Sequence, residues 1–206
     1  SLLPDRFINH WALDGSDIDV NLRDKPGRDA RYEVVDGEKA LYLTGLNSFA
    51  EVPAVAFNPE GFTFMLWIKP LNQSFNFNPF IYSDWYPTAT FYVILHVGYK
   101  SVFSRFKGLG SSDFLTYYLG ISLTHWTHLS VSWNKTLNET KIFYNGTLKQ
   151  TTTKSSEIMQ TTHKYFHLGI NGGSWPGVNV KTFHGYMKHL MVFNKTLNAQ
   201  EIKSAI

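Results

Sequence analysis

The most regular alternation of apolar and polar residues in the chain runs from Thr127 to Trp133. Every second residue in this stretch is apolar, and polar residues lie between them: Leu129, Val131 and Trp133 alternate with His128, Ser130 and Ser132. A period of two is typical of a β-strand that buries one face. We therefore expect a core strand here, with its polar face turned outward.

A turn signal, Asn145-Gly146, comes shortly after this strand. A type I′ turn needs positive φ angles at both central residues, and Asn and Gly tolerate that conformation best. Because the apolar residues 142–144 lead directly into the pair, a hairpin is expected from Tyr144 to Thr147.

The stretch 62–69, FTFMLWIK, is apolar on both alternating faces, as expected for a central strand covered on both sides. Shorter runs between turn residues predict further strands at 40–53, 80–83, 91–97, 102–106, 115–121, 165–169 and 183–194. Stretches without a period predict loops at 21–31, 71–79 and 84–87, and a polar edge or loop at 151–162. Asn198 and Glu201 have the spacing of a helix N-terminal capping box, so a short helix is expected there. The fold class is therefore all-β, a sandwich.

The composition narrows the class further. A chain of 206 residues suits a single sandwich domain over 1–206. The formal net charge of +3 is scattered, which favours neither a nucleic acid partner nor insertion of this domain into a membrane. Cysteine is absent, so the domain can form neither a disulfide framework nor a thiolate metal site.

Five sequons for N-glycosylation point to an extracellular setting, in a secreted protein or a cell-surface ectodomain. They begin at Asn72, Asn134, Asn138, Asn145 and Asn194. Three of them lie in the loop and turn of the hairpin region, where a glycan leaves the core undisturbed. The alternative is a chance enrichment of polar turns.

Several motifs resemble those of one superfamily. The stretch 126–146 resembles "WhHlavtwdg…lylNG", 62–70 resembles "ftvsaWikp", and 183–202 resembles "f.G.iDevriynraLs.eEI". These are motifs of the laminin-G-like and pentraxin-like domains of the concanavalin-A-like lectin/glucanase superfamily. The resemblance, which extends from about Trp11 to Ile202, implies a jelly-roll sandwich of two antiparallel sheets with a short C-terminal helix.

The resemblance also raises the question of calcium. Related domains begin with "hWpLdg" and hold a structural calcium ion between this first loop and the penultimate strand, which makes Asp14, Asp17 and Asp19 the candidate ligands here. The alternative is that these acids belong to a solvated loop. Lys188 stands where the family has an acid and His189 where a second acid is usual, and an ammonium repels a cation. No cofactor is therefore expected, with calcium kept only as a weak alternative.

The sequence offers no catalytic pattern. The paired carboxylates of the β-glucan hydrolases, in the order E-x-D-x-E, do not occur, and neither does G-x-S-x-G. Close pairs among the eight histidines have strand spacings that do not bring both rings to one ion. The protein is therefore expected not to be an enzyme.

Two functions remain open. The first is a non-catalytic recognition or adhesion module that binds an extracellular protein or associates with itself, with the outward face near His128 as a surface for a homodimer. The second is a lectin that binds a glycan through aromatic residues in loops. Its candidate ligand-binding residues are Asp84, Trp85, Tyr86, Asn171 and Trp175. The same loop aromatics have a structural alternative, in which they plug a packed loop.

Overall fold

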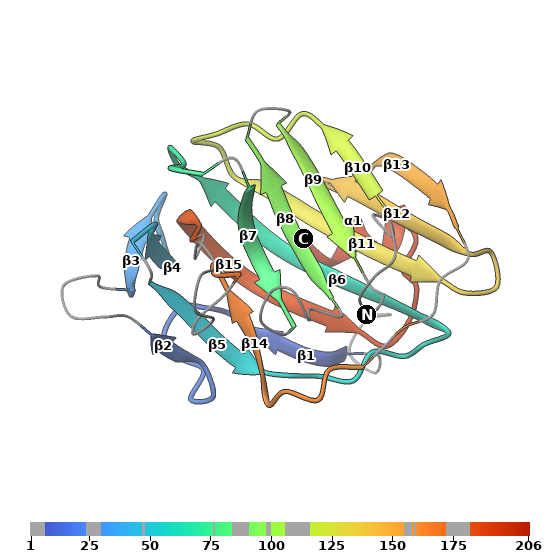
Figure 1. Cartoon of the computed structure of the whole chain (residues 1–206), viewed down its shortest axis with the longest axis horizontal. Helices are drawn as coiled ribbons and strands as arrows, with labels where there is room; N and C mark the ends of the chain where they lie inside the picture. Colours follow the sequence, from blue (N-terminus) through green and yellow to red (C-terminus); the bar gives the residue numbers. More distant parts are fainter. Residues whose placement is uncertain are drawn as a thin grey trace, which may run out of the picture.

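The structure, a computed structural model, consists of two stacked antiparallel sheets (Figure 1). It describes residues 7–23, 30–46, 48–75, 77–83, 91–97, 100–105, 116–154, 158, 160–171 and 182–206. The architecture confirms the predicted jelly-roll sandwich of two antiparallel sheets.

Sheet A has the strand order β13-β12-β11-β6-β15-β4-β3, and β1 also pairs with β15. Its strands are β1 (Phe7–Trp11), β3 (Arg31–Val35), β4 (Glu38–Thr44), β6 (Gly61–Pro70), β11 (Thr127–Asn134), β12 (Glu139–Tyr144), β13 (Thr147–Thr153) and β15 (His184–Phe193). Sheet B has the order β10-β9-β8-β7-β14-β5-β2. Its strands are β2 (Asn21–Arg23), β5 (Phe49–Pro53), β7 (Phe77–Tyr82), β8 (Tyr92–His96), β9 (Ser101–Arg105), β10 (Thr116–Leu119) and β14 (Tyr165–Leu168).

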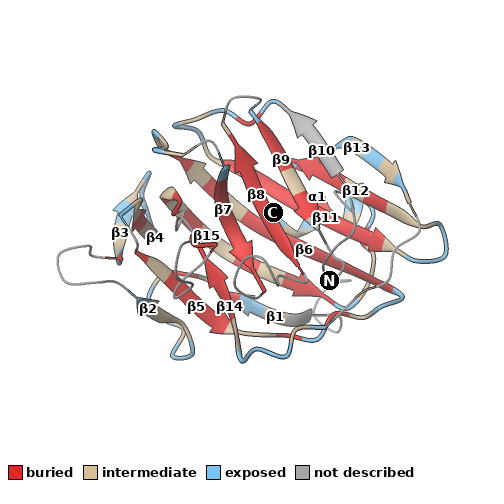
Figure 2. Cartoon of the chain, in the orientation of Figure 1, coloured by how far each residue is buried: buried red, intermediate tan, exposed pale blue. Residues whose placement is uncertain are grey.

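The core lies between the sheets and is organised by β6 and β11, as the sequence predicts. Their register places Leu129 opposite Leu66 and Val131 opposite Phe64, and all four side chains are fully buried. The central strands of both sheets are buried along most of their length, whereas β3 and β13 at the edges of sheet A are more exposed (Figure 2).

The second apolar face of β6 is buried on the outside of sheet A. Met65 belongs there to a separate apolar cluster with Phe143, Phe193, Leu197 and Ile202. The last of these residues is on helix α1 (Ala199–Ala205), which begins at the predicted capping box of Asn198 and Glu201. The C-terminal helix therefore covers one end of sheet A's outer face.

The hairpin after β12 is the predicted one. Asn145 and Gly146 have φ angles of 52° and 76°. The Asn145 side chain also accepts a hydrogen bond of 2.9 Å from the backbone N–H of His128, which ties the turn to β11.

Two loop predictions were partly wrong. Residues 21–31 contain β2, which pairs with β5, and the first residue of β3. Residues 71–79 contain the start of β7, where Pro79 precedes a bulge that accommodates its missing N–H. The sequence of both segments has no local period. They are extended because each pairs with a neighbouring strand.

The outward polar face of β11 is not free for pairing two copies of the domain, which corrects that part of the homodimer hypothesis. His128, Ser130 and Ser132 are at most 2% exposed. The His128 ring packs edge-on against Trp67 at 5.1 Å, and Ser130 lies between Met65 and Phe143 of the neighbouring strands.

Among the residues that the structure describes, no helix is long and apolar enough to cross a membrane.

Candidate functional site

The first loop holds its acids by internal hydrogen bonds. Asp14 Oδ1 accepts from the backbone N–H and the hydroxyl of Ser16, and these bonds lower the pKa of Asp14. Asp17 Oδ2 accepts from the backbone N–H of Leu13 at 3.2 Å, and Asp19 is exposed. The carboxylates of Asp14 and Asp17 thus accept hydrogen bonds from residues of their own loop.

The opposite wall of this loop is built by β15. His189 sits in a bulge with a φ of 50°, and its backbone N–H donates to the carbonyl of Ala12 at 3.0 Å. Its ring lies 2.7 Å from Glu38 Oε1 and 3.2 Å from His10 Nε2. Burial and the neighbouring His189 lower the pKa of His10.

The residues around this loop do not fit calcium. The ion needs six to eight oxygen ligands, whereas β15 faces this loop with the imidazole of His189. In the part of the chain that the structure describes, no group of three or more His, Asp or Glu side chains is placed to hold a metal ion. The loop is closed instead by hydrogen bonds within the protein.

Next to this region, aromatic side chains gather on the outer face of sheet A. We call this surface the shelf and define it by Tyr42, Trp67, Trp126, Tyr186 and Lys188. Cross-strand register places Tyr42 opposite Tyr186, with ring centres 5.0 Å apart, and Lys188 opposite Trp67. Trp126 comes just before β11 and lies 6.4 Å from Tyr186. All four aromatic residues are half-buried.

Charged groups hold the shelf in place. Lys188 Nζ lies 4.4 Å from the ring centre of Trp126 and 2.8 Å from Glu38 Oε2. Asp36 Oδ2 accepts from Lys69 Nζ and from Trp126 Nε1, both at 2.8 Å, and these bonds lower the pKa of Asp36. The indole is therefore fixed at its edge by a carboxylate and over its ring by an ammonium.

The far side of the shelf is built in the same way. Arg31 donates to Glu33 Oε1 at 2.6 Å, and its guanidinium lies 4.7 Å from the ring centre of Tyr42. Tyr186 donates its hydroxyl to Glu33 Oε2 at 3.1 Å, and burial followed by this carboxylate raises the pKa of Tyr186. Trp, Tyr and Arg are the residue types that contribute most of the binding energy at protein interfaces, and all three occur together here.

A row of paired polar and aromatic side chains crosses sheet B. The cross-strand pairs Glu51–His167, His167–Tyr82 and Tyr82–Tyr92 form one row on its outer face, and all four residues are buried. Burial lowers the pKa of His167 to about 4, with a smaller contribution from His163. His167 Nε2 is 4.0 Å from Glu51 Oε1, and because the ring is neutral near pH 7, this contact is not an ion pair.

Most of the ligand-binding residues expected in loops lie outside the described residues: Asp84, Trp85, Tyr86 and Trp175. Asn171 is described and is 8% exposed. Ser83 follows β7 and Asn171 follows β14, and because these two strands are antiparallel, the two residues lie at opposite ends of the pair. They are separated by on the order of 15 Å along the strands, and the row of sheet B crosses the strands at the Ser83 end, because Tyr82 belongs to it.

The sequons fall at both ends of sheet A. Strands β11 and β15 both run antiparallel to β6, so Asn134, Asn138 and Asn194 lie near one end, whereas Asn145 lies at the end next to the shelf. Asn72 is also at the shelf end, where its carbonyl contacts His184 Nδ1 at 2.8 Å. Asn72, Asn145 and Asn194 are exposed, and the other two are half-buried.

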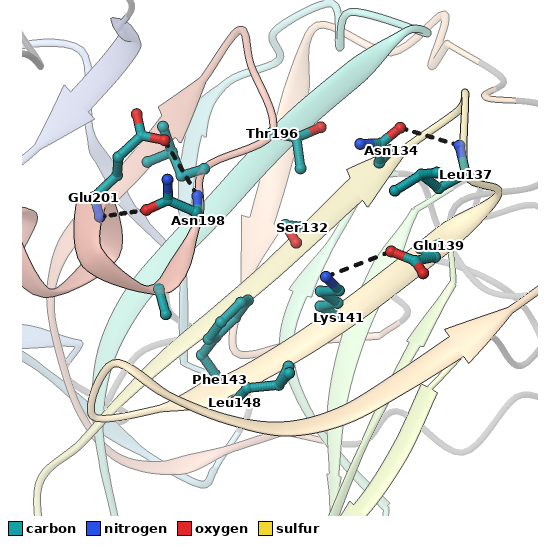
Figure 3. Close-up of a pocket in the computed structure, with 12 residues that line it drawn as sticks. Ser132, Asn134, Leu137, Glu139, Lys141, Phe143, Leu148, Thr196, Asn198 and Glu201 are labelled. Carbon is teal, nitrogen blue, oxygen red and sulfur yellow. Dashed lines mark hydrogen bonds and ion pairs between the residues drawn. The ribbon is translucent and has the colours of Figure 1, made fainter.

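A groove of about 320 Å³ lies at the end opposite the shelf, between β11, β12 and the start of α1 (Figure 3). Asn134, Glu139 and Lys141 form its polar wall, and Phe143 and Leu148 form part of its apolar floor. Glu139 and Lys141 are joined by an ion pair of 3.4 Å.

Sequence reasoning did not find the shelf. The alternation of 62–69 predicts only a strand covered on both sides, and Lys188 enters the sequence analysis only as a residue that repels calcium. The available signal was the outward position of Trp67 in the alternation of 62–69, which cross-strand register brings next to Lys188. The contribution of Trp126 depends on its contacts with β3–β4 and β15 and has no local signal.

Comparison with known proteins agrees with the fold. Residues 44–203 match a laminin-G family model described as the concanavalin A-like lectin/glucanases superfamily. Because the match covers more than half of the chain, the chain belongs to this family, as its motifs predict. The comparison with curated proteins finds no match.

Solved structures with the same fold include binding and enzyme proteins. Domain 4 of AbnA, an extracellular arabinanase from Geobacillus stearothermophilus in complex with arabinotriose, is 21% identical with a TM-score of 0.69, and 97% of each chain is covered. The receptor binding domain of botulinum neurotoxin type G is 14% identical with a TM-score of 0.65, over 97% of this chain and 50% of the toxin chain. A mutant Trypanosoma rangeli sialidase is 12% identical with a TM-score of 0.60, over 89% of this chain and 28% of the sialidase. At these identities the similarity establishes the fold alone.

Proposed function

We propose that this domain is a non-catalytic recognition module of an extracellular protein and that it binds a protein partner through the shelf. The observation that carries the proposal is the half-buried Trp126 indole, fixed between Lys188 and Asp36 beside sheet A. A ring that is already ordered loses little conformational entropy on binding. Most of the favourable free energy of its contacts therefore appears as binding affinity. Tyr186 and the Arg31–Tyr42 stack extend the same surface.

The proposal that the domain is not an enzyme has support from its carboxylates. Glycoside hydrolysis needs two carboxyl groups, about 5 Å apart for retention or about 6.5–9.5 Å apart for inversion. On the described strands of sheet B, Glu51 is the only acidic residue. The acids of the shelf, Glu33, Asp36 and Glu38, are each engaged by a cation. The hydrogen bonds from these cations lower the pKa values of Asp36 and Glu38, whereas a general acid needs a raised pKa.

The shelf is tested with a fluorescent tetramer of the domain that is added to intact cells. Trp126→Ala is expected to weaken binding by about 30-fold, the effect of removing a 2 kcal/mol hot spot. Phe77→Ala is the matched control, because Phe77 is 37% exposed but lies on sheet B. Binding that survives protease treatment of the cells, or equal effects of the two variants, contradicts the proposal.

Self-association is tested separately by sedimentation of the purified domain. If the partner is a second copy, a dimer dissociates in Trp126→Ala and persists in Phe77→Ala. A dimer that persists in both variants places the contact elsewhere.

A second candidate function is glycan binding through the aromatic residues expected in the loops, Trp85 and Trp175, because sugar rings stack on aromatic faces. The row of sheet B does not carry this function, since its four residues are buried. A domain of the same fold was solved with arabinotriose. The test is a glycan array with and without chelator, in which Trp85→Ala or Trp175→Ala reduces binding and Trp126→Ala does not.

A further inference from the structure

The groove beside α1 leaves apolar side chains in contact with solvent. Leu137 at its rim is 54% exposed and Leu148 on its floor is 44% exposed. These are two of the few large apolar side chains in the described part of the chain that are this exposed. They face one groove together with Phe143 and Leu197. Leu137 and Leu148 are therefore available for contact with a group that enters the groove, whereas Phe143 and Leu197 are buried beneath them.

Asn134 is the one asparagine of the five sequons that lines this groove. Its Oδ1 accepts a hydrogen bond of 3.2 Å from the backbone N–H of Leu137. Because that N–H must be given an acceptor, the assignment of Oδ1 and Nδ2 is fixed. The amide nitrogen is turned away from Leu137, toward the side of the groove on which Thr196 lies (Figure 3).

This geometry is compatible with a glycan. N-glycosylation uses the amide nitrogen and leaves the carbonyl oxygen in place, so the bond from Leu137 persists in the modified side chain. The tight turn 135–138 holds the asparagine at the groove, since the Asn138 N–H donates to the Lys135 carbonyl at 3.1 Å. A first sugar on Asn134 therefore begins inside the groove.

We propose that an N-glycan on Asn134 lies in this groove and forms part of the folded surface. The proposal rests on the extracellular setting in the proposed function. The C–H face of a pyranose packs against apolar side chains as it does against aromatic rings, and here the exposed Leu137 and Leu148 offer that contact. Lys141 and Glu139 stand at the same wall and offer hydrogen bonds to the hydroxyl groups.

The other sequons differ in this respect. Asn72, Asn145 and Asn194 are exposed and do not line the groove, and Asn138 has a φ of 50° in the turn beyond it. A glycan at Asn72, Asn145 or Asn194 therefore begins at an exposed side chain outside the groove. Of the five possible glycans, only the one on Asn134 is therefore expected to pack against the protein.

The experiment uses the domain secreted from eukaryotic cells, with site occupancy measured by mass spectrometry of its glycopeptides. Thr136→Ala removes the sequon of Asn134 but keeps the Asn134 side chain and its hydrogen bond, and Thr136 is itself exposed. The matched control is Ser74→Ala, which removes the sequon of Asn72 at another exposed position. Trimming the wild-type glycans to a single N-acetylglucosamine tests whether the first sugar is sufficient.

Asn134 is expected to be occupied. Thr136→Ala is expected to lower Tm by about 2–4 °C, the size of a 1 kcal/mol change in a domain of this length, and to increase binding of an apolar dye. Thr136→Ser, which keeps the sequon, restores both values, and Ser74→Ala changes neither. The trimmed protein keeps the wild-type Tm.

Two results overturn the inference while leaving the proposed function intact. One is an empty Asn134 when other sequons are occupied. The other is an occupied Asn134 whose loss in Thr136→Ala shifts Tm no more than Ser74→Ala does. If none of the five sequons is occupied in the secreted protein, the extracellular part of the proposed function loses its main support and this inference fails with it.

Discussion

Lys188 Nζ lies 4.4 Å above the ring centre of Trp126 and donates to Glu38 Oε2 at 2.8 Å. The side chain of Lys188 is only 15% exposed, so its ammonium is largely removed from water and compensated by a carboxylate and an indole. The family motif that residues 183–202 resemble has an acid at this position. Here a built-in cation joins β15 to β4 and to the segment before β11.

Lys188→Ala is expected to lower the free energy of unfolding by about 2 kcal/mol, because it removes a partly desolvated cation–π contact and leaves Glu38 with one partner fewer. The measurement is urea denaturation at neutral pH. Lys135→Ala is the control: Lys135 pairs with Glu60 at 3.7 Å with both side chains more than half exposed, and such pairs contribute little. Equal losses in the two variants exclude a special role for Lys188.

Removal of calcium is expected to leave the domain unchanged. The carboxylates of Asp14 and Asp17 are engaged by the loop's own N–H groups, and the Lys188 ammonium lies on the facing strand. The measurement is Tm with excess calcium and with chelator. A fall of more than about 5 °C with chelator, roughly 2 kcal/mol for this size, shows that calcium binds. In that case Asp14→Asn and Asp17→Asn should abolish the difference.

The sequence predicted the parts of the fold that local chemistry determines. Three local patterns predicted their elements, and the structure contains all three. They are the alternation at 127–133, the stretch 62–69 that is apolar on both faces, and the turn pair Asn145-Gly146. The capping box at Asn198 and Glu201 is equally local. These elements follow from a period of two or a single turn, so no knowledge of the partner strand is needed.

The remainder depends on contacts between distant segments. Residues 21–23 become a strand because β5 offers an unpaired edge. The shelf exists because Trp126 reaches Asp36 across 90 residues of sequence. The bulge at His189 likewise turns its ring toward Glu38 and His10, a direction that regular alternation does not predict.

The wild-type domain is expected to have no glycosidase activity on any β-glucan at any pH. Glu51→Gln is the variant that tests any turnover that is observed. Glu51 is the one acid on the described strands of sheet B and pairs with Arg23 at 3.2 Å. A reducing-sugar assay of the wild-type domain checks this. Turnover that disappears in Glu51→Gln refutes the expectation, whereas activity that persists in every acid variant indicates contamination.

Stability is expected to fall as the pH is lowered from 7 to 5. Burial lowers the pKa values of His128 and His167 from 6.5 to about 4. The unfolded chain therefore takes up protons on these two residues near pH 6.5, while the folded chain does not do so until about pH 4. Because the unfolded state binds more protons in this interval, the free energy of unfolding decreases there as the pH falls.

The size of this effect follows from the two lowered pKa values. A tenfold difference in proton affinity between the folded and unfolded chains corresponds to about 1.4 kcal/mol, so each histidine accounts for about 3 kcal/mol between pH 6.5 and 4, of which about 2 kcal/mol is lost between pH 7 and 5. Urea denaturation at pH 7.5, 6.5, 5.5 and 5.0 at constant ionic strength measures the decrease. Carboxylates such as Asp36 and Glu38, whose pKa values are lowered from near 4, contribute only below this range.

His128→Gln or His167→Gln is expected to reduce the slope of stability against pH between 7 and 5, because each variant removes one group that the unfolded state protonates. His125→Gln is the control, since His125 is exposed and lies next to the same strand. It should leave the slope unchanged. A wild-type stability that is constant or rises from pH 7 to 5 shows that these buried rings are not neutral in the folded protein.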